Sequence, residues 1–272
     1  MPEGPEIRLE ADKIAAAISG EIVDEVYFEQ KKLKCYEQQL RGSRVASVSA
    51  RGKALLIRFE NSLTMYSHNQ LYGRWYVRPR GEKPNTNRTL RAALHGPKMS
   101  ALLYSASEIA VLAPEQLAKQ AYLQKLGPDP LDGAVSWKDF VKRLRSATFA
   151  KRSLGALYLD QSFIAGIGNY LRSEILFRAG LLPDRILRDL SLSEIHRLAR
   201  ATVTITRRAY EKRGVTNPAQ RVSELKKRGL KRGSYRFAVF ARAGKPCYEC
   251  GKRIERIEFS GRRLYLCRRC QA

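Results

Sequence analysis

The sequence predicts a multidomain protein of the α+β class. An antiparallel β-sandwich with a leading helix is expected first, followed by a helical domain and a four-cysteine finger. Short strand-like runs fill the first 125 of the 272 residues, helix signals follow residue 133, and four of the five cysteines lie in the last 26 residues. The hydrophobic fraction of 44% is enough to bury proper cores, which excludes a disordered polycation.

The first half begins with one predicted helix. Ile7, Ile14 and Ile18 recur at helical spacing, Pro5 suits the first turn, and Gly20 suits a C-terminal cap. Short apolar runs separated by turn-forming residues follow it. They predict strands over residues 23–28, 44–49, 54–59, 63–66, 74–77, 89–94, 100–104 and 109–112. Eight short strands at this spacing favour an antiparallel sandwich.

The second half has helix signals. Ser136 can cap a helix that runs to about residue 144, and residues 169–179 form a helix that Gly180 ends. Ser191 and Glu194 form a capping box that opens a long helix ending at Gly214. We therefore expect the segment after residue 133 to be mainly helical.

The predicted domain boundaries follow breaks in composition. Two prolines and two glycines in residues 126–133 predict a linker between the halves. Residues 215–234 are polar, six of them are basic, and we expect a mobile connector there. The predicted domains are residues 1–125, the hinge linker 126–133, a helical domain at 134–234 and a finger at 235–272.

The net charge is +25 and is unevenly spread. Residues 1–125 hold 19 basic and 13 acidic side chains, whereas residues 126–272 hold 32 and 13. Such a charge favours a polyanionic partner, either nucleic acid or an acidic membrane surface. The chain has no run of 18 apolar residues, no signal-peptide pattern and no basic amphipathic helix with exposed aromatics. We therefore expect a soluble, intracellular protein with no membrane partner.

Four cysteines near the C-terminus have the spacing of a metal site. Cys247 and Cys250 form one pair, Cys267 and Cys270 form another, and 16 residues separate the pairs. Four thiolates make a closed tetrahedral zinc site that has no open position for water, so one structural zinc ion per chain is predicted. Four unrelated free cysteines are the alternative. The remaining Cys35 is expected to be a buried or half-buried residue without a redox role.

The finger also contains a predicted β-hairpin between its cysteine pairs. Gly261 supplies the turn, and Arg262 and Arg263 lie at its tip. By composition alone, this tip is a solvated basic turn or a nucleic-acid contact.

The N-terminus offers a candidate nucleophile. Removal of Met1 would expose the secondary amine of Pro2, which can attack an aldehyde-level carbon to form an iminium ion. Glu3 and Glu6 stand beside it and could supply general acid-base help. The alternative is a simple helix start with proline in the first turn and acids near the positive end of the helix dipole.

Three further motifs are weak when each is taken alone. Residues 51–53 (Arg-Gly-Lys) precede a strand, and residues 166–170 (Gly-Ile-Gly-Asn-Tyr) join two helical segments. The glycines at this junction could leave backbone amides free for a phosphate at a helix N-terminus. Residues 68–73 (His-Asn-Gln-Leu-Tyr-Gly) could insert into a base stack or form an ordinary hairpin.

Four motifs, taken in their order along the chain, resemble those of one family. They are the N-terminal Met-Pro-Glu-Gly-Pro-Glu, residues 51–53, residues 166–170 and the four-cysteine finger with Gly261-Arg262. The family is the DNA glycosylase family that contains formamidopyrimidine-DNA glycosylase and endonuclease VIII. Residues 65–73 resemble its bacterial endonuclease VIII branch, and the resemblance runs from Pro2 to Cys270. It implies a β-sandwich, a helix-two-turns-helix domain and a zinc finger, with no organic cofactor.

The resemblance also implies catalytic roles. Pro2 would attack the sugar C1′ of a damaged nucleotide, and Glu3 would assist base loss and ring opening. Lys53 would contact phosphates and transfer a proton in β-elimination. Arg262 would clamp phosphate and assist δ-elimination, and Glu6 would be a supporting active-site acid.

The implied DNA contacts form a second group. Gln70, Leu71 and Tyr72 would fill the gap that an extruded base leaves, which is the way such enzymes reach a base in a duplex. Asn169 would hold a phosphate, and Lys125 would be a basic contact to DNA.

We therefore expect a base excision repair enzyme. It would be a monomer in the bacterial cytoplasm, associated with the nucleoid, that removes oxidised pyrimidines from double-stranded DNA and cleaves the strand by β,δ-elimination. One alternative is a preference for oxidised or ring-opened purines. The other is a zinc-finger protein that binds nucleic acid without catalysis.

Overall fold

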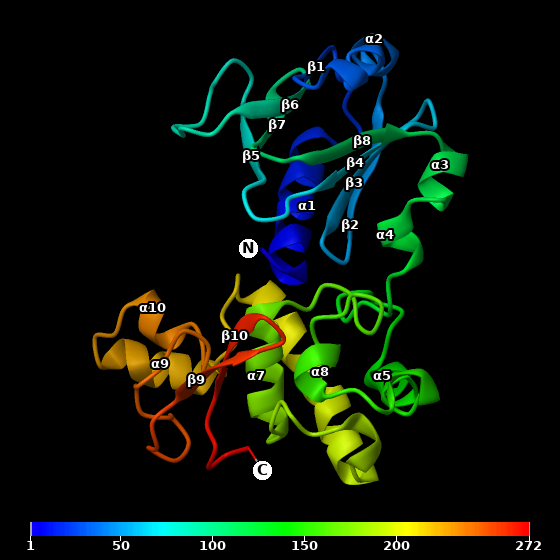
Figure 1. The fold of residues 1–272 in the computed structure, drawn as a ribbon. Helices are drawn as coiled ribbons and strands as arrows, with labels where there is room; N and C mark the ends of the chain where they lie inside the picture. The colour runs from blue at the N-terminus through cyan, green and yellow to red at the C-terminus, as the bar shows by residue number, and fades with distance from the viewer. Residues whose placement is uncertain (1, 272) are drawn as a thin grey trace. The chain divides into compact units, whose positions relative to one another are not determined.

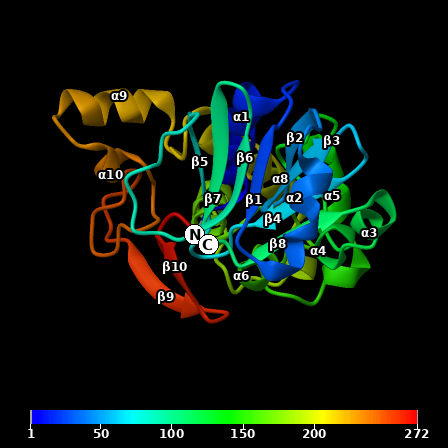
Figure 2. The same ribbon diagram turned by 90° about the horizontal axis from the view of Figure 1, so that it is seen from above.

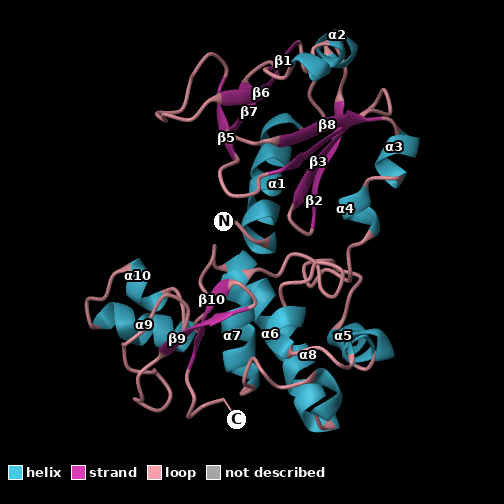
Figure 3. Ribbon diagram, in the orientation of Figure 1, coloured by secondary structure: helices cyan, strands magenta, loops and turns pink. Residues whose placement is uncertain are grey.

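A computed structural model describes residues 2–271 and divides them into two compact units. The first, the β unit, comprises Pro2 and residues 6–125. The second, the helical unit, comprises Glu3–Pro5 and residues 126–271. Strands dominate the former and helices the latter (Figure 3). The fold class predicted from the sequence is therefore confirmed.

The β unit contains two four-stranded antiparallel sheets (Figure 1). One has the strand order β1–β6–β7–β5 and the other β2–β3–β4–β8. The strands are β1 (Glu25–Phe28), β2 (Val45–Arg51), β3 (Ala54–Phe59), β4 (Thr64–His68), β5 (Arg74–Pro79), β6 (Leu90–His95), β7 (Met99–Tyr104) and β8 (Glu108–Leu112). All eight predicted strands are confirmed, with small shifts at their ends.

The leading helix α1 (Gly4–Ile18) supplies the core of the β unit. Ile7, Ile14 and Ile18 are buried, and they share one hydrophobic cluster with residues of both sheets, including Phe28 and Ile57. The helical spacing of the isoleucines places them on one face, which packs against the sheets.

The sequence did not predict the short helices of this unit. They are α2 (Cys35–Leu40), α3 (Pro114–Ala118) and α4 (Ala121–Gln124), with a 3-10 turn at Lys31–Leu33. Elements of four to six residues are too short to show a helical period. Cys35 is exposed, so the expectation of a buried or half-buried thiol was wrong. It begins a surface helix of which Leu40 is the buried residue.

The helical unit confirms the predicted helix signals. Its helices up to residue 211 are α5 (Trp137–Leu144), α6 (Leu154–Leu157), α7 (Asn169–Ala179) and α8 (Leu192–Glu211), with 3-10 turns at Ala147–Phe149 and Leu187–Asp189. The capping box at α8 is present, because Glu194 N donates to Ser191 Oγ and Ser191 N donates to Glu194 Oε2. Gly180 ends α7 with a left-handed φ of 69°.

The connector predicted over residues 215–234 is instead ordered. It contains α9 (Ala219–Lys227) and α10 (Arg232–Tyr235). Thr216 N donates to Arg236 O, Asn217 Nδ2 donates to Tyr235 O, and Leu225 is buried. The expectation of a mobile connector was therefore wrong. Hydrogen bonds from the first residues of the segment to the residues just after its end, together with the buried Leu225, stabilise it despite its polar composition.

The finger contains the predicted hairpin. Strand β9 (Glu255–Phe259) pairs with β10 (Arg262–Leu266), and Ser260 and Gly261 form the turn with φ values of 52° and 68°. The views of Figures 1 and 2 agree in placing α9, α10 and this hairpin on the same side of the helical unit. Among residues 2–271, none of the helices has the length and apolar character needed to cross a bilayer.

Candidate functional site

The N-terminal segment is anchored to the start of α7 by Glu3. Its side chain is 2% exposed. Oε2 accepts hydrogen bonds from Gly168 N at 2.8 Å and Leu171 N at 3.2 Å, and Oε1 accepts one from Tyr170 N at 2.8 Å. A carboxylate here satisfies amides that a helix leaves unpaired and faces the positive end of its dipole. Glu3 is therefore held in one orientation, next in the chain to Pro2.

Two glycines make room for this arrangement. A Cβ on Gly168 would lie 2.4 Å from Glu3 Cδ. Gly166 has a φ of 81°, and its carbonyl accepts a hydrogen bond from Gly4 N at 2.8 Å. The sequence suggested that these glycines leave amides free for a phosphate. That was wrong for the amides of Gly168, Tyr170 and Leu171, because the chain's own carboxylate takes them.

Arg172 connects α7 to the hairpin tip that carries Arg262. Its side chain is fully buried, and NH2 donates to Asn169 Oδ1 at 2.7 Å. NH1 donates to Phe259 O at 3.3 Å and NH2 to Arg263 O at 3.4 Å, so both strands of the hairpin are contacted. Asn169 Nδ2 also donates to Arg263 O, at 2.6 Å.

These contacts fix the backbone on both sides of the turn, while Arg262 itself is exposed. Burial, together with the charge of Arg262, lowers the pKa of Arg172 to about 10, and the charge of Glu3 opposes this shift. A guanidinium with that pKa remains charged at neutral pH. The helical unit thus brings together three of the predicted residues, Glu3, Asn169 and Arg262.

A second buried charge on α7, Glu174, holds the segment that follows α10. Its carboxylate accepts hydrogen bonds from the backbone N–H groups of Ala238, Val239 and Phe240 at 2.8 to 2.9 Å, and one from Thr216 Oγ1 at 2.5 Å. Neither Arg172 nor Glu174 was predicted from the sequence. The sequence carries no clear signal for them, because α7 is buried at nearly every position although polar and charged residues are spread along it. Charges in such a setting are buried only when they are paired, and their partners lie far along the chain.

The four predicted cysteines form one cluster. Their sulfur atoms all lie within 4.8 Å of one another. Cys247 Sγ lies 3.8 Å from Cys270 Sγ, and Cys250 Sγ lies 3.4 Å from Cys267 Sγ. Tetrahedral zinc with Zn–S bonds of about 2.3 Å requires sulfur atoms about 3.8 Å apart, so this set fits one structural zinc ion.

Lys53 lies in the β unit, in the turn between β2 and β3. Gly52 turns the chain with a φ of 59°, and Lys53 N donates to Tyr122 OH at 2.9 Å. The lysine is 8% exposed. The adjacent His68 ring packs edge-on against Tyr122, and burial and the charge of Lys53 lower the pKa of His68. The lysine is therefore held in a largely buried setting at one end of a sheet.

The predicted gap-filling residues follow β4 in the same unit. Leu71 and Tyr72 are 61% and 69% exposed, which is unusual for apolar side chains of this size. Gln70 has a left-handed φ of 47°, and its amide side chain pairs with Ser107 Oγ at 3.0 Å and Glu108 Oε2 at 3.1 Å. The segment thus presents two apolar side chains to solvent from a hydrogen-bonded base.

The remaining predicted residues lie near the start of α1 and at the end of α4. Pro2 is half-buried and precedes α1, and Glu6 is half-buried in the first turn of that helix. Lys125 is exposed at the C-terminal end of α4. All three belong to the β unit.

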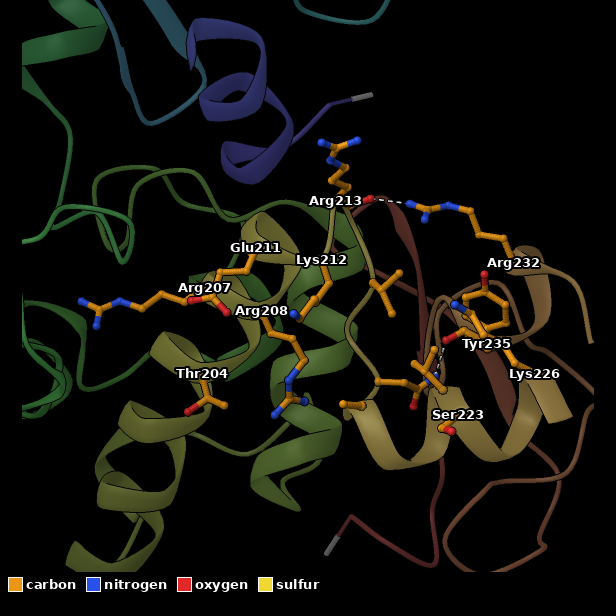
Figure 4. A pocket seen from close by; sticks show the side chains of 14 residues that line it. Thr204, Arg207, Arg208, Glu211, Lys212, Arg213, Ser223, Lys226, Arg232 and Tyr235 are labelled. Carbon is orange, nitrogen blue, oxygen red and sulfur yellow. Dashed lines mark hydrogen bonds between the residues drawn. The ribbon is translucent and has the colours of Figure 1, made fainter. Parts of the chain in front are cut away.

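A basic pocket of about 770 Å³ lies between α8 and the α9–α10 segment (Figure 4). Six basic residues and one acidic residue line it: Arg207, Arg208, Lys212, Arg213, Lys226, Arg232 and Glu211. Burial and the nearby charge of Arg178 lower the pKa of Arg208, whereas Glu211 raises it. The pocket was not predicted from the sequence, because its residues come together only when α9 is ordered.

The chain matches three known domain families. Residues 1–106 match the formamidopyrimidine-DNA glycosylase N-terminal domain, and residues 126–220 match the H2TH domain of the same enzyme. Residues 244–272 match the zinc finger found in FPG and IleRS.

Full-length relatives and a structural neighbour extend these matches. The chain is 46% identical over 271 residues to Endonuclease 8 of Escherichia coli (strain K12 / DH10B) and to Endonuclease 8 of Shigella sonnei (strain Ss046), covering all of each protein. Its fold is similar to that of Lactococcus lactis Fpg in complex with DNA containing N7-benzyl-Fapy-dG. The TM-score is 0.81 at 20% identity, with 99% of each chain covered.

Proposed function

Because the chain belongs to the family of formamidopyrimidine-DNA glycosylase and endonuclease VIII, we propose that it removes oxidised pyrimidines from double-stranded DNA. Enzymes of this family are DNA glycosylases and abasic-site lyases of base excision repair, and this chain is one of them. The proposal adds the lesion class, the residues that act and the elimination steps. It also includes action as a monomer in the bacterial cytoplasm, associated with the nucleoid.

The anchored N-terminal segment carries the proposal. Glu3 is fixed by three backbone amides of the helical unit, and Pro2 is the residue that precedes it in the chain. After removal of Met1, the Pro2 nitrogen attacks C1′ of the damaged nucleotide and the bond to the base breaks. Glu3 assists departure of the base and opening of the sugar ring, which leaves an iminium ion on Pro2.

Strand cleavage follows from the iminium. Its positive charge makes the C2′ proton acidic, and loss of that proton expels the 3′ phosphate. A second elimination expels the 5′ phosphate, and water then releases the sugar remnant from Pro2. Lys53 transfers the C2′ proton and contacts a phosphate. Arg262 clamps the phosphates, and Glu6 is a supporting acid of the active site. The four cysteines would hold a zinc ion that stabilises the finger carrying Arg262, and with four sulfur ligands that ion would have no open position for Lewis-acid catalysis.

DNA binding uses both units. Leu71 and Tyr72 replace the stacking lost when the damaged base leaves the duplex, and Gln70 contacts the bases beside them. Lys125 and the basic pocket between α8 and α9 contact phosphates, which gives salt-dependent and sequence-independent affinity. The Asn169 side chain, which binds the hairpin backbone, is proposed to hold a phosphate beside Arg262.

A parallel cleavage assay tests the lesion class. Duplexes containing dihydrouracil or 8-oxoguanine are incubated with the enzyme under single-turnover conditions. Faster excision of dihydrouracil, with products carrying phosphate at both ends of the gap, supports the proposal. Faster excision of 8-oxoguanine supports the alternative preference for purines. Binding without cleavage of either duplex, in a chain whose intact mass shows that Met1 is absent, indicates the non-catalytic alternative.

A further inference from the structure

Glu10, on α1, lies behind the exposed segment Gln70–Leu71–Tyr72 and has no role in the chemistry above. It is half-buried, and its Oε2 accepts a hydrogen bond from Asn69 Nδ2 at 2.7 Å. Both residues belong to the β unit. This contact joins the leading helix to the residue that immediately precedes the segment.

Asn69 is the base of the exposed segment. It is 3% exposed, and its carbonyl accepts a hydrogen bond from Gly73 N at 2.8 Å, which closes the turn from residue 69 to residue 73. The turn is tight, since a Cβ on Gly73 would lie 2.7 Å from Asn69 Cα. The direction in which Leu71 and Tyr72 project therefore depends on the placement of Asn69.

The polar environment of Asn69 is incomplete. Its Oδ1 is buried and has no hydrogen-bond partner among the described residues. An ionised carboxylate can accept the Nδ2–H but can offer nothing to Oδ1. A neutral carboxyl group can accept from Nδ2–H and also carries an O–H that can donate to Oδ1, as in a paired acid and amide.

The charges around Glu10 leave both forms accessible near neutral pH. Burial raises the pKa of Glu10 to about 7, and the charge of Glu6 adds to the rise. The hydrogen bond from Asn69 and the charges of Arg74 and Lys13 oppose it. A carboxyl group with this pKa changes its protonation over the range in which a DNA repair enzyme works.

We propose that Glu10 is a positioning residue that holds the segment Gln70–Leu71–Tyr72, through the side-chain amide of Asn69, in the conformation that fills the gap in the duplex. The inference rests on the proposed role of that segment. The neutral form of Glu10 holds Asn69 by two contacts and the ionised form by one. The segment is therefore held best in its gap-filling conformation below about pH 7. Glu10 influences the rate of base excision in this way without contacting DNA.

The test compares four proteins: wild type, Glu10→Gln, Glu10→Ala and the surface control Glu21→Gln. Glutamine keeps an acceptor for Nδ2–H and a donor for Oδ1, and it does not titrate. Two activities are measured from about pH 5.5 to about pH 8.5. One is single-turnover excision of dihydrouracil from a duplex. The other is strand cleavage at an abasic site in a single-stranded oligonucleotide, which has no opposite strand for Leu71 and Tyr72 to enter.

We expect Glu10→Ala to lower duplex excision about tenfold, or roughly 1.4 kcal/mol, and to leave single-strand cleavage within about twofold of wild type. The ratio of wild-type to Glu10→Gln duplex excision should fall as the pH rises through about 7, because Glu10 ionises over that range and glutamine does not. The ionisation of other groups affects both proteins and cancels in the ratio. Glu21→Gln should follow wild type throughout.

Two results would overturn the inference. One is a wild-type to Glu10→Gln ratio that does not change with pH. The other is an equal loss of duplex and single-strand activity in Glu10→Ala, which would indicate a general structural defect. If Glu10→Ala does not fold, the Glu10→Gln ratio alone decides. Failure of wild type to cleave either substrate would instead reject the proposed function, so the two failures are distinguishable.

Discussion

Substitution of Gly168 by alanine should displace Glu3 and disable base excision. The backbone of Gly168, at φ −135° and ψ −153°, is extended and open to any residue. The obstacle is Glu3 itself, since the new Cβ would lie 2.4 Å from its Cδ and 2.5 Å from its Oε1. Both distances are far below van der Waals contact, so the carboxylate must leave the start of α7.

The expected cost follows from the three hydrogen bonds that would be lost. Hydrogen bonds to a charged group contribute roughly 1.5 to 3 kcal/mol each, but local detachment of the N-terminal segment limits the total. We expect a loss of roughly 3 to 5 kcal/mol in the free energy of unfolding, and a midpoint lowered by roughly 10 °C. Displacement of an acid-base group should also slow excision roughly 100-fold.

Thermal denaturation and single-turnover excision of dihydrouracil measure these two effects. The matched control is Gly133→Ala, because a Cβ at Gly133 meets nothing within 4 Å and the residue has no positive φ. Wild-type excision and an unchanged midpoint in Gly168→Ala would refute the assignment of Glu3 to the start of α7.

Three further predictions concern the finger, the buried acid and the basic pocket. Removal of zinc with a chelator should unfold the finger and abolish duplex binding, with circular dichroism and gel shift as measurements; binding that survives complete zinc loss would contradict a structural role. The folded-state pKa of Glu10, about 7, lies above the ordinary value of 4.5 for a glutamate, so its contribution to stability is complete below about pH 4.5 and is lost as the pH rises to about 7. Denaturant titrations of Glu10→Gln and wild type should therefore diverge by at most about 3 kcal/mol over that window, and parallel curves would contradict the assignment. The double substitution Lys212→Ala and Lys226→Ala should reduce the slope of log affinity against log salt concentration by about 1 to 2. The control double substitution Lys31→Ala and Lys32→Ala should leave this slope unchanged. Equal slopes in wild type and both variants would show that the pocket does not contact DNA.

The sequence predicted elements whose signals are local. The spacing of Ile7, Ile14 and Ile18, the capping box of Ser191 and Glu194, and the paired cysteines each specify a structure within a few residues. The eight strands were found for the same reason, since alternating short runs and turn residues are read locally.

Long-range polar contacts could not be predicted in this way. Glu3 meets Gly168 across 165 residues, and no local pattern signals that a carboxylate will cap a helix so far along the chain. The same holds for Arg172, which reaches the hairpin backbone at Phe259 and Arg263. The order of residues 215–234 was missed because one buried leucine and a few hydrogen bonds, rather than composition, stabilise it.

The most direct test of the central claim is to identify the residue that forms the covalent intermediate. The enzyme is incubated with an abasic duplex and borohydride, digested, and analysed by peptide mass spectrometry. We predict a single adduct on the nitrogen of Pro2. A control chain extended by residues ahead of Pro2 should give no adduct, because that nitrogen is then a tertiary amide. An adduct on Lys53 or another lysine, or an equal yield from the extended chain, would contradict the mechanism.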